Sequence, residues 1–198
     1  MIKQAKFIIS VADADKLPEY SAPQIAIAGK SNVGKSSFIN FMTNQNKLAK
    51  TSSEPGRTRL VNYFEINNGD YYFVDLPGYG YARVNKVEKQ KWGELVEGYL
   101  QNCQSLINVF VLVDIRHEPT EDDKIMVNYL YSTGTPFTLI ATKADKLSRA
   151  QQGRARQTIA NAFGVGTGDI IVTSSAAKTG KEAVLAKIDA LLQGWQNS

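Results

Sequence analysis

The chain has 198 residues, of which 43% are hydrophobic and 21% charged, and this length and composition fit one α/β domain spanning residues 1–198. It contains one cysteine, Cys103, and one histidine, His117, which exclude an internal disulfide framework and a Cys/His zinc site. The net charge of +4 is compatible with nucleic-acid contact and equally with an ordinary basic surface.

The N-terminal segment and the apolar runs give no sign of a membrane protein. Residues 1–10 are too few and too charged for a signal peptide. The longest apolar run, residues 106–113, is interrupted by Asn108 and is far shorter than a membrane span. We therefore expect a cytoplasmic protein without membrane contact.

Apolar segments alternate along the chain with longer amphipathic segments, which is typical of repeated βα units. The expected strands are residues 7–11, 24–28, 61–66, 71–75, 107–114, 137–142 and 169–173. The expected helices are residues 35–43, 86–101, 120–132, 148–163 and 181–195. Eight apolar residues recur at helical intervals and are expected in the core: Tyr99, Leu100, Ile125, Val127, Leu130, Leu185, Ile188 and Leu192.

These elements predict a mostly parallel sheet of six or seven strands with helices on both faces. The segment 67–70, Asn-Asn-Gly-Asp, predicts a hairpin between the strands at 61–66 and 71–75, and therefore one antiparallel edge. Two segments without periodicity, residues 44–60 and 75–84, are long for loops of a compact domain, and such loops are usually functional.

A glycine-rich segment lies between the strand expected at 24–28 and the helix expected at 35–43. It consists of Gly29, Lys30, Ser31, Asn32, Val33, Gly34, Lys35 and Ser36 and matches the phosphate-loop pattern. The backbone N–H groups of such a loop and the positive end of its helix bind phosphates. We assign Lys35 to the β- and γ-phosphates and the Ser36 hydroxyl to Mg²⁺. The alternative is a glycine turn with a surface lysine.

A second motif, Asp75, Leu76, Pro77 and Gly78, ends the strand expected at 71–75. In a phosphate-loop protein the acid supports Mg²⁺, often through water, and the amide of Gly78 senses the γ-phosphate. The pattern alone is weak because Asp and Gly are common turn residues. Its position at a strand end, downstream of a phosphate loop, makes it strong.

A third motif, Thr142, Lys143, Ala144 and Asp145, ends the strand expected at 137–142. The Asp145 carboxylate can accept hydrogen bonds from the N1–H and the exocyclic amine of guanine, donors that adenine lacks on that edge, so it would select GTP over ATP. Lys143 can lay its aliphatic stem along the purine. The alternative is a helix-capping aspartate beside a solvated lysine.

Thr173, Ser174 and Ser175 follow the last expected strand, where a backbone amide would meet guanine O6. The register is open by one residue, with Ala176 as the neighbour, and a plain serine-rich turn is the alternative.

The loop at 44–60 contains the remaining candidate Mg²⁺ ligand. Thr58 would complete the Mg²⁺ shell when the γ-phosphate is present, and hydrolysis would release the loop. Thr51, Ser52 and Ser53 are rivals, but none has the same Gly-Arg-Thr setting directly ahead of a strand.

Taken in order, these segments resemble a translation-factor-related GTPase and, more narrowly, the EngB (YihA, YsxC) family of bacterial ribosome-assembly GTPases. The residues that carry the resemblance are 28–37, 55–58, 75–82, 142–145 and 174–175. The Gly-Tyr-Gly-Tyr-Ala tract at 78–82 is the most family-specific piece, and the likeness covers the chain except for roughly the first twenty residues and the last few.

The resemblance implies a three-layer P-loop GTPase fold, bound GTP or GDP with Mg²⁺, and slow hydrolysis. It adds Ser37, Gly56, Arg57, Arg59 and Leu60 to the nucleotide site and gives catalytic roles to Lys35, Thr58 and Gly78. It also implies work on the large ribosomal subunit, through rRNA or ribosomal proteins and not DNA, and a requirement for normal cell division and septation. We expect a monomer.

Two positions bear on the hydrolysis rate. Many GTPases carry a water-orienting glutamine directly after the glycine of the second motif, and this chain has Tyr79 there. We therefore expect slow intrinsic turnover, accelerated by a partner or an ion. Asn32 occupies the position that helps to hold K⁺ in related GTPases, and the alternative role is a hydrogen bond within the loop.

The two long loops and the helix that follows the second are rich in cations: Lys47, Lys50, Arg57, Arg59, Arg83, Lys86, Lys89 and Lys91. With Tyr79 and Tyr81 among them, this surface would bind rRNA phosphates and stack on exposed bases. The alternatives are a solvated surface and, for Arg57, a cis arginine finger.

Two rival functions belong to other classes. A P-loop nucleotide kinase is disfavoured by the third motif and by the lack of an arginine-rich lid segment. A nucleotide-binding module that does not hydrolyse GTP stays open because of Tyr79.

Overall fold

The computed structural model describes residues 1–50, 60–80 and 86–197, and for residues 86, 88 and 89 it describes the backbone. The strands are β1 (Ala5–Val11), β2 (Gln24–Gly29), β3 (Val61–Ile66), β4 (Tyr71–Asp75), β5 (Leu106–Asp114), β6 (Phe137–Thr142) and β7 (Ile170–Val172). The α-helices are α1 (Lys35–Thr43), α2 (Lys86–Asn102), α3 (Glu121–Thr133), α4 (Arg149–Phe163) and α5 (Lys181–Gln196). Short 3₁₀ helices occupy Ala14–Lys16, Ala144–Lys146 and Thr167–Asp169.

The strands form one seven-stranded sheet in the order β1-β3-β4-β2-β5-β6-β7. β2 pairs in parallel with β4 and β5, and β5-β6-β7 continue in parallel. β3 is antiparallel to both β1 and β4. The predicted hairpin is confirmed, with Asn67, Asn68 and Gly69 all at positive φ in its turn. β1 lies outside the hairpin, so the edge of the sheet is β1 and not β3.

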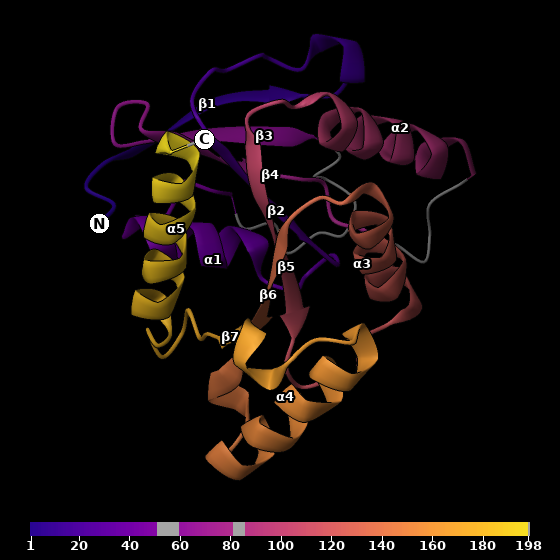
Figure 1. Cartoon of the computed structure of the whole chain (residues 1–198), viewed down its shortest axis with the longest axis vertical. Coiled ribbons are helices and arrows are strands. Elements are labelled where there is room, and N and C mark those ends of the chain that lie inside the picture. The colour runs from indigo at the N-terminus through magenta and orange to yellow at the C-terminus, as the bar shows by residue number, and fades with distance from the viewer. Residues whose placement is uncertain (51–59, 81–85, 198) are drawn as a thin grey trace.

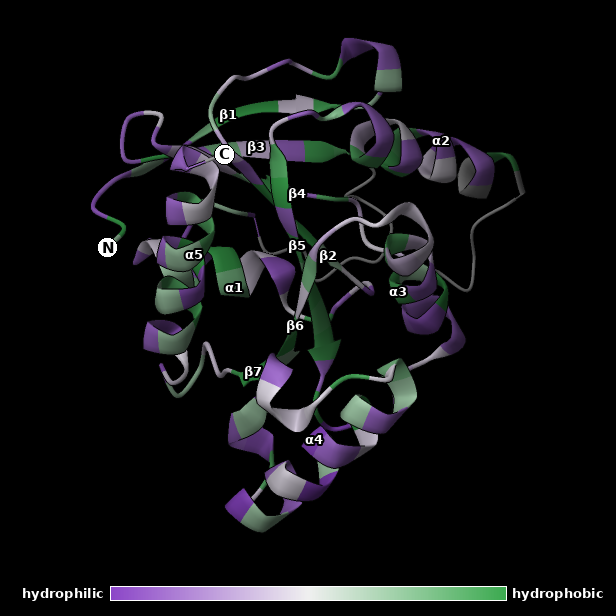
Figure 2. Ribbon diagram, in the orientation of Figure 1, coloured by the Kyte–Doolittle hydropathy of each residue, from purple (hydrophilic) through white to green (hydrophobic). Residues whose placement is uncertain are grey.

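Helices cover both faces of the sheet, as predicted for a three-layer α/β fold (Figure 1). On β2, Ile25 and Ile27 pack into one core cluster with residues of α1 and α5, whereas Ala26 and Ala28 pack into another with residues of α2, α3 and α4. This alternation is the period of a strand that is buried on both faces. Figure 2 shows the resulting run of hydrophobic residues along the central strands.

One expected core residue is placed wrongly by the sequence argument. Ile125 is 64% exposed, because α3 turns Asp123, Met126, Val127 and Leu130 towards the sheet and Ile125 lies off that stripe. The other seven residues are buried or packed against the core.

Because β2, β4, β5, β6 and β7 run in the same direction, their carboxyl ends meet at one edge of the sheet. There Ile27 is level with Asp75, Gly29 with Leu112, and Asp114 with Thr142. Ligands of open α/β sheets bind at this edge. Within the described residues, no helix is both long and apolar enough to cross a membrane.

Candidate nucleotide-binding site

The phosphate loop is the turn that joins β2 to α1. The chain leaves the sheet at Gly29, where a Cβ would lie 2.8 Å from Val33 Cγ1 and 2.9 Å from the Leu112 carbonyl oxygen, so no other residue fits. Asn32 then adopts φ +63° and Gly34 φ +111°, which curls the backbone back towards the helix. The sequence pattern and the backbone therefore agree on an anion-binding turn.

The first turn of α1 carries Lys35, Ser36 and Ser37, all at least partly exposed to solvent. No described side chain caps this helix, so its first N–H groups and its positive dipole end stay available to an anion.

Asp75 ends β4 as a buried carboxylate with an unsatisfied oxygen. The residue is 3% exposed, and its Oδ1 has no hydrogen-bond partner among the described residues. Burial raises the pKa of Asp75 above its ordinary value, although the Lys35 ammonium and a hydrogen bond with Asn62 oppose the rise. Such a group is costly unless a ligand or water meets it. The position therefore fits a hydrated cation.

The segment after Asp75 crosses the phosphate loop. The Leu76 amide donates to the Ile27 carbonyl at 3.0 Å. A Cβ on Gly78 would lie 3.1 Å from Lys35 Nζ and 3.2 Å from Ser31 N, so any larger residue would crowd the phosphate loop. Tyr79 is 6% exposed, which corrects the expectation that it stacks on RNA bases: the side chain points into the protein.

The third motif is tied to the phosphate loop by its first residue. Thr142 is buried at the end of β6, and its hydroxyl donates to the Val33 carbonyl at 2.9 Å and to the Val113 carbonyl at 3.1 Å. The candidate base reader and the candidate phosphate loop are thus held in a fixed relation.

Asp145 is held by neighbours on both sides. Its Oδ1 accepts from the Ser174 hydroxyl at 2.6 Å, and its Oδ2 lies 3.1 Å from Lys146 Nζ. These two contacts lower the pKa of Asp145, so the carboxylate is ionised and oriented before a base arrives.

The segment 173–176 leaves two amides for a base. The Thr173 amide donates to the Ala141 carbonyl and the Ser174 amide to the Thr179 carbonyl. Among the described groups, none accepts from the amides of Ser175 or Ala176. Ser174 therefore acts on Asp145 through its side chain, and the amides of Ser175 and Ala176 are the ones left for the predicted contact with guanine O6.

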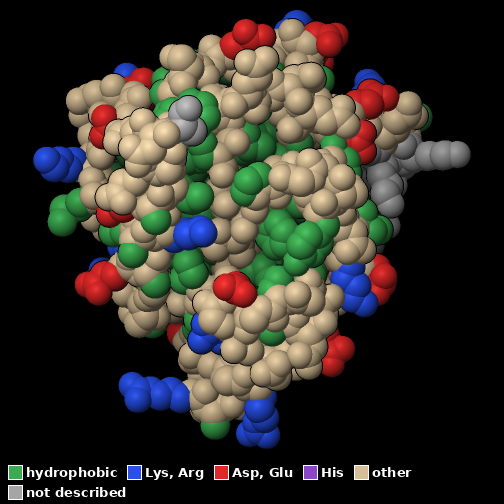
Figure 3. Space-filling view, in the orientation of Figure 1, with side chains coloured by type: hydrophobic (Ala, Val, Ile, Leu, Met, Phe, Trp, Pro, Cys, Tyr) green, Lys and Arg blue, Asp and Glu red, His purple; other side chains and the backbone are tan. Residues whose placement is uncertain are grey.

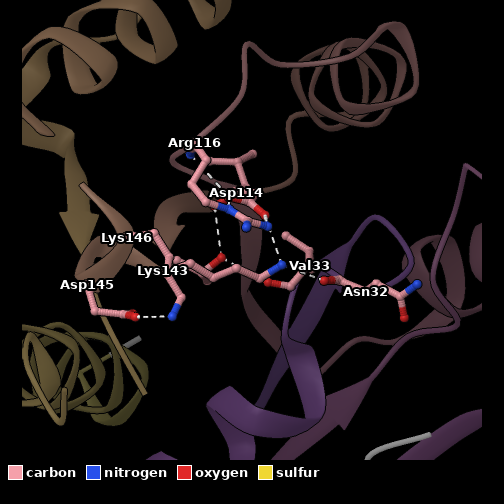
Figure 4. A network of polar contacts seen from close by, with 9 residues as sticks. Asn32, Val33, Asp114, Arg116, Lys143, Asp145 and Lys146 are labelled. Atoms are coloured by element: carbon pink, nitrogen blue, oxygen red, sulfur yellow. Dashed lines mark hydrogen bonds and ion pairs between the residues drawn. The ribbon is translucent and has the colours of Figure 1, made fainter. Parts of the chain in front are cut away.

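A charged network that the sequence did not reveal links the phosphate loop to the third motif (Figure 4). Asp114, the last residue of β5, accepts from Arg116 Nε at 2.9 Å and Nη2 at 2.7 Å. Lys143 Nζ lies 2.8 Å from both Asp114 Oδ2 and the Asn32 carbonyl oxygen. Burial alone would raise the pKa of Asp114, but the hydrogen bonds from Arg116 and Lys143 outweigh it and hold the pKa well below its ordinary range.

A cavity of about 630 Å³ opens between these motifs. Its lining comes from the phosphate loop and α1, from the third motif and from the segment after β7: Val33, Gly34, Ser37, Asn40, Phe41, Asn44, Asn46, Thr142, Lys143, Asp145, Lys146, Ser175, Ala176 and Lys178. A cavity of this size suits a small molecule with an apolar ring. The purine position that the sequence predicts is therefore an open cavity.

Several candidate residues fall in a part of the chain for which no placement is described. Gly56, Arg57, Thr58 and Arg59 lie outside the described residues, as do Thr51, Ser52, Ser53, Pro55, Tyr81 and Arg83. Leu60 is described and directly precedes β3.

The fold and this site together define a P-loop GTPase. The model of the 50S ribosome-binding GTPase family matches residues 24–143. A probable GTP-binding protein EngB from Desulfosudis oleivorans is 44% identical over 188 residues, which covers 95% of each chain. A probable GTP-binding protein EngB from Clostridium kluyveri is 46% identical over 192 residues, 96% of this chain and 97% of the relative. The chain therefore belongs to the EngB family of GTP-binding proteins.

Solved structures share the fold. The crystal structure of a probable GTP-binding protein EngB superposes with a TM-score of 0.71 at 23% identity, covering 86% of this chain and 99% of that one. The structure of Era from Aquifex aeolicus gives a TM-score of 0.69 at 20% identity, covering 85% of this chain and 56% of that one.

Proposed function

We propose that residues 1–198 form one GTP-binding domain that acts as a slow, Mg²⁺-dependent GTPase switch during assembly of the large ribosomal subunit. The observation that carries the proposal is that Lys35, Asp75 and Asp145 lie at the same edge of the sheet, and that Asp145 lines a cavity large enough for a purine. Each residue belongs to a different motif.

The phosphates and Mg²⁺ are assigned to the phosphate loop and the end of β4. The uncapped start of α1 and the unsatisfied oxygen of Asp75 support this assignment. Ser36 and Asp75 would hold Mg²⁺, with Thr58 as the third candidate, and Lys35 would bind the β- and γ-phosphates. The metal ion would neutralise charge on the phosphates. Gly78, which lies beside Lys35, would meet the γ-phosphate.

The base is assigned to the third motif. Asp145, ionised and oriented by Ser174, is set to accept from the N1–H and the amine of guanine. Lys143 spans the gap between the phosphate loop and Asp114, which places its aliphatic stem beside the cavity.

Calorimetry with four nucleotides tests the binding proposal. Wild-type protein with Mg²⁺ should bind GDP and GTP and bind ATP at least a hundredfold more weakly, because adenine lacks both donors. Asp145→Asn should lose guanine affinity and gain affinity for xanthosine triphosphate, whose C2 carbonyl can accept from the new amide. Equal uptake of GTP and ATP by the wild type, or no gain of xanthosine binding by the variant, would contradict the assignment.

Slow hydrolysis follows from the surroundings of Tyr79. The residue that replaces the water-orienting glutamine is buried, and its hydroxyl donates to Asp123, so it offers nothing to an attacking water. The remaining alternative, a module without hydrolysis, predicts no phosphate release in a single-turnover assay with and without large ribosomal subunits. The switch predicts release that the subunits accelerate.

Activation by K⁺ is part of the proposal. The Asn32 carboxamide is exposed, and no described residue hydrogen-bonds to it, which favours an ion ligand over a loop-stabilising role. Hydrolysis should therefore be several-fold faster in K⁺ than in Na⁺ at equal ionic strength. Equal rates would remove the ion from the mechanism.

The proposed partner is the large ribosomal subunit, and the cytoplasm is the compartment in which the protein would meet it. The name of the matching family model, which specifies ribosome binding, supports this proposal. A surface suited to rRNA phosphates also supports it, since α4 exposes Arg149 and Arg154 and contains no acidic residue. Figure 3 shows Lys and Arg side chains projecting at the lower end of the molecule, where α4 lies.

Sedimentation with purified large subunits tests the switch. A non-hydrolysable GTP analogue should move more of the protein into the subunit fraction than GDP does. Equal cosedimentation in both nucleotides would contradict a GTP-operated switch. Under the proposed function, defects in cell division and septation are downstream consequences of impaired subunit assembly.

A further inference from the structure

The segment that follows β4 is hydrogen-bonded to three separate parts of the fold: the phosphate loop, α2 and α3. The Ser31 amide of the phosphate loop donates to the Tyr79 carbonyl at 2.9 Å. The indole Nε1 of Trp92, on α2, donates to the Pro77 carbonyl at 3.0 Å. The Tyr79 hydroxyl donates to Asp123 Oδ1, on α3, at 2.9 Å. Gly78 lies between Pro77 and Tyr79, the two residues that form these hydrogen bonds.

The Tyr79 side chain reaches α3 through a buried contact. Its ring meets the Trp92 ring edge-on, with centroids 6.3 Å apart and planes at 76°. Burial, together with the charge of Asp123, raises the pKa of Tyr79 well above its ordinary value, so the phenol keeps its proton and remains a donor at physiological pH.

The acceptor of that bond also holds the start of α3. Asp123 Oδ2 accepts from the Thr120 amide at 2.8 Å, which is a capping-box contact of the helix, and also from the Thr120 hydroxyl at 2.7 Å. One carboxylate thus connects the backbone around Gly78 to the first turn of α3. A displacement of this backbone would pull on the cap.

Gly78 itself has little room to move independently. The absence of a side chain lets it approach Lys35 Nζ and the Ser31 backbone, as described above. Its neighbours Pro77 and Tyr79 form the hydrogen bonds to α2, α3 and the phosphate loop. The position of the Gly78 amide is therefore set by contacts within the protein and not by contacts with GDP.

We infer that Tyr79 is a positioning residue for γ-phosphate recognition, which holds the Gly78 amide in place through its bond to Asp123 and carries the presence of the γ-phosphate to α2 and α3. The inference rests on the proposed GTPase function. It gives Tyr79 a role different from that of the glutamine it replaces: it orients the backbone instead of a water molecule.

Tyr79→Phe tests the inference because it removes the hydroxyl and keeps the ring. The affinity for a non-hydrolysable GTP analogue should fall about 3- to 10-fold, the loss expected for one hydrogen bond. The affinity for GDP should stay within about twofold, because Gly78 recognises only the third phosphate. Tyr131→Phe is the matched control. Tyr131 lies on the C-terminal half of α3, and its hydroxyl donates to the Phe163 carbonyl of α4 at 3.2 Å. The substitution should change neither affinity.

Trp92 supplies a second readout that a purely structural role would not move. The chain has two tryptophans, so Trp195→Phe leaves Trp92 as the only indole. In that background, the emission should differ between the GDP-bound and analogue-bound states, and adding Tyr79→Phe should reduce the difference. The Trp195→Phe protein must first bind GDP like the wild type.

The outcomes separate the inference from the function beneath it. If the wild type binds neither nucleotide, the proposed function fails. If the wild type binds both and Tyr79→Phe weakens both equally, or changes neither the affinity ratio nor the Trp92 signal, the inference is overturned. Should Tyr79→Phe melt too early to assay, Trp92→Phe keeps a ring beside Tyr79, loses the bond to Pro77, and should weaken analogue binding selectively. An equal loss for GDP would again overturn the inference.

Discussion

Asp75 has a charge that the protein alone does not satisfy. The residue is fully enclosed at the end of β4, one oxygen has no described partner, and burial raises its pKa. A purely structural residue at this position would be apolar or fully hydrogen-bonded. The carboxylate therefore costs stability in the nucleotide-free protein, and its benefit has to come from a bound ligand.

Replacing Asp75 by asparagine should stabilise the nucleotide-free protein while weakening Mg²⁺-dependent GTP binding. We expect Tm at neutral pH to rise by about 2–4 °C, the shift that roughly 1 kcal/mol produces in a chain of this size. A raised folded-state pKa penalises the ionised form, so the gain is present at neutral pH and disappears as the pH falls below the ordinary carboxyl pKa of 3.8. Thermal melts across pH would measure it.

Asp70→Asn, at an exposed site in the β3–β4 turn, is the control for this melt series. It should leave Tm unchanged at every pH. A lower Tm for Asp75→Asn at neutral pH would show that the carboxylate contributes to the fold and would contradict the argument.

Asp114 should govern how long a nucleotide stays bound and not which base is chosen. Asp114→Asn removes the charge that holds Lys143 between β5 and the phosphate loop. We expect GDP dissociation, followed with a fluorescent analogue, to accelerate about tenfold, which corresponds to roughly 1.4 kcal/mol. Preference for guanine over adenine should persist, because Asp145 is untouched. Loss of that preference would assign Asp114 to base recognition.

The same substitution has a distinct pH signature in the free protein. The pKa of Asp114 is lowered, so its ion pairs stabilise the fold above the ordinary carboxyl pKa of 3.8, and this contribution decreases as the pH falls from there towards the folded-state value. The difference in unfolding free energy between wild type and Asp114→Asn should therefore be largest near neutral pH and shrink below about pH 4. Glu121→Gln, which breaks an exposed pair with Lys124, should show little difference at any pH.

At the scale of elements, the sequence predicted the fold closely because local and global signals agreed. Glycines marked the turn into α1, alternating apolar residues marked the strands, and the Asn-Gly turn marked the hairpin. Boundary errors were small and had a cause. Thr120 and Ser148 were predicted inside helices but are the caps that precede α3 and α4, because their side chains bond back to the first turn.

The site was less completely predictable than the fold. Motif residues were found because their spacing has chemical meaning, and the structure brings the described ones to one sheet edge. Asp114 and Trp92 belong to no motif, and only the three-dimensional arrangement shows them beside Lys143 and Pro77. The position of Asp114 at a strand end was a usable signal, whereas the contact of Trp92 was not. Tyr79 was assigned to the surface because neighbouring cations suggested a loop facing RNA.

Removing two arginines from α4 should weaken contact with ribosomal RNA without affecting the nucleotide. Arg149 and Arg154 are exposed on a helix that has no acidic residue. In Arg149→Gln/Arg154→Gln, binding to large subunits should weaken, and the slope of log affinity against log salt should become shallower by roughly 1.5. GDP affinity should stay unchanged. A Lys3→Gln/Lys6→Gln control makes the same charge change at the β1 edge; equal slopes in both variants would exclude a specific role for α4.

At the scale of the whole molecule, the site is assembled from the ends of several helices and strands and not from one element. Its described residues come from the ends of β2, β4, β5 and β6, from the segment after β7 and from the start of α1. These segments are held together by Thr142 bonding to the phosphate loop, Lys143 bridging to β5, and Ser174 bonding to Asp145. A nucleotide that contacts all of them would link the two halves of the sheet.

Nucleotide binding should therefore stabilise the entire fold and not one loop. GDP with Mg²⁺ at a hundred times its Kd would contribute about 2.7 kcal/mol if the unfolded chain does not bind it, which in a chain of this size corresponds to a rise in Tm of roughly 5–10 °C. Hydrogen exchange should show added protection on β2, β5 and β6 together. ADP at the same concentration is the control and should leave Tm within about 1 °C, because Asp145 cannot pair with adenine. Added protection confined to the phosphate loop, with Tm unchanged, would mean that the ligand binds one segment and that the strand ends do not act as one site.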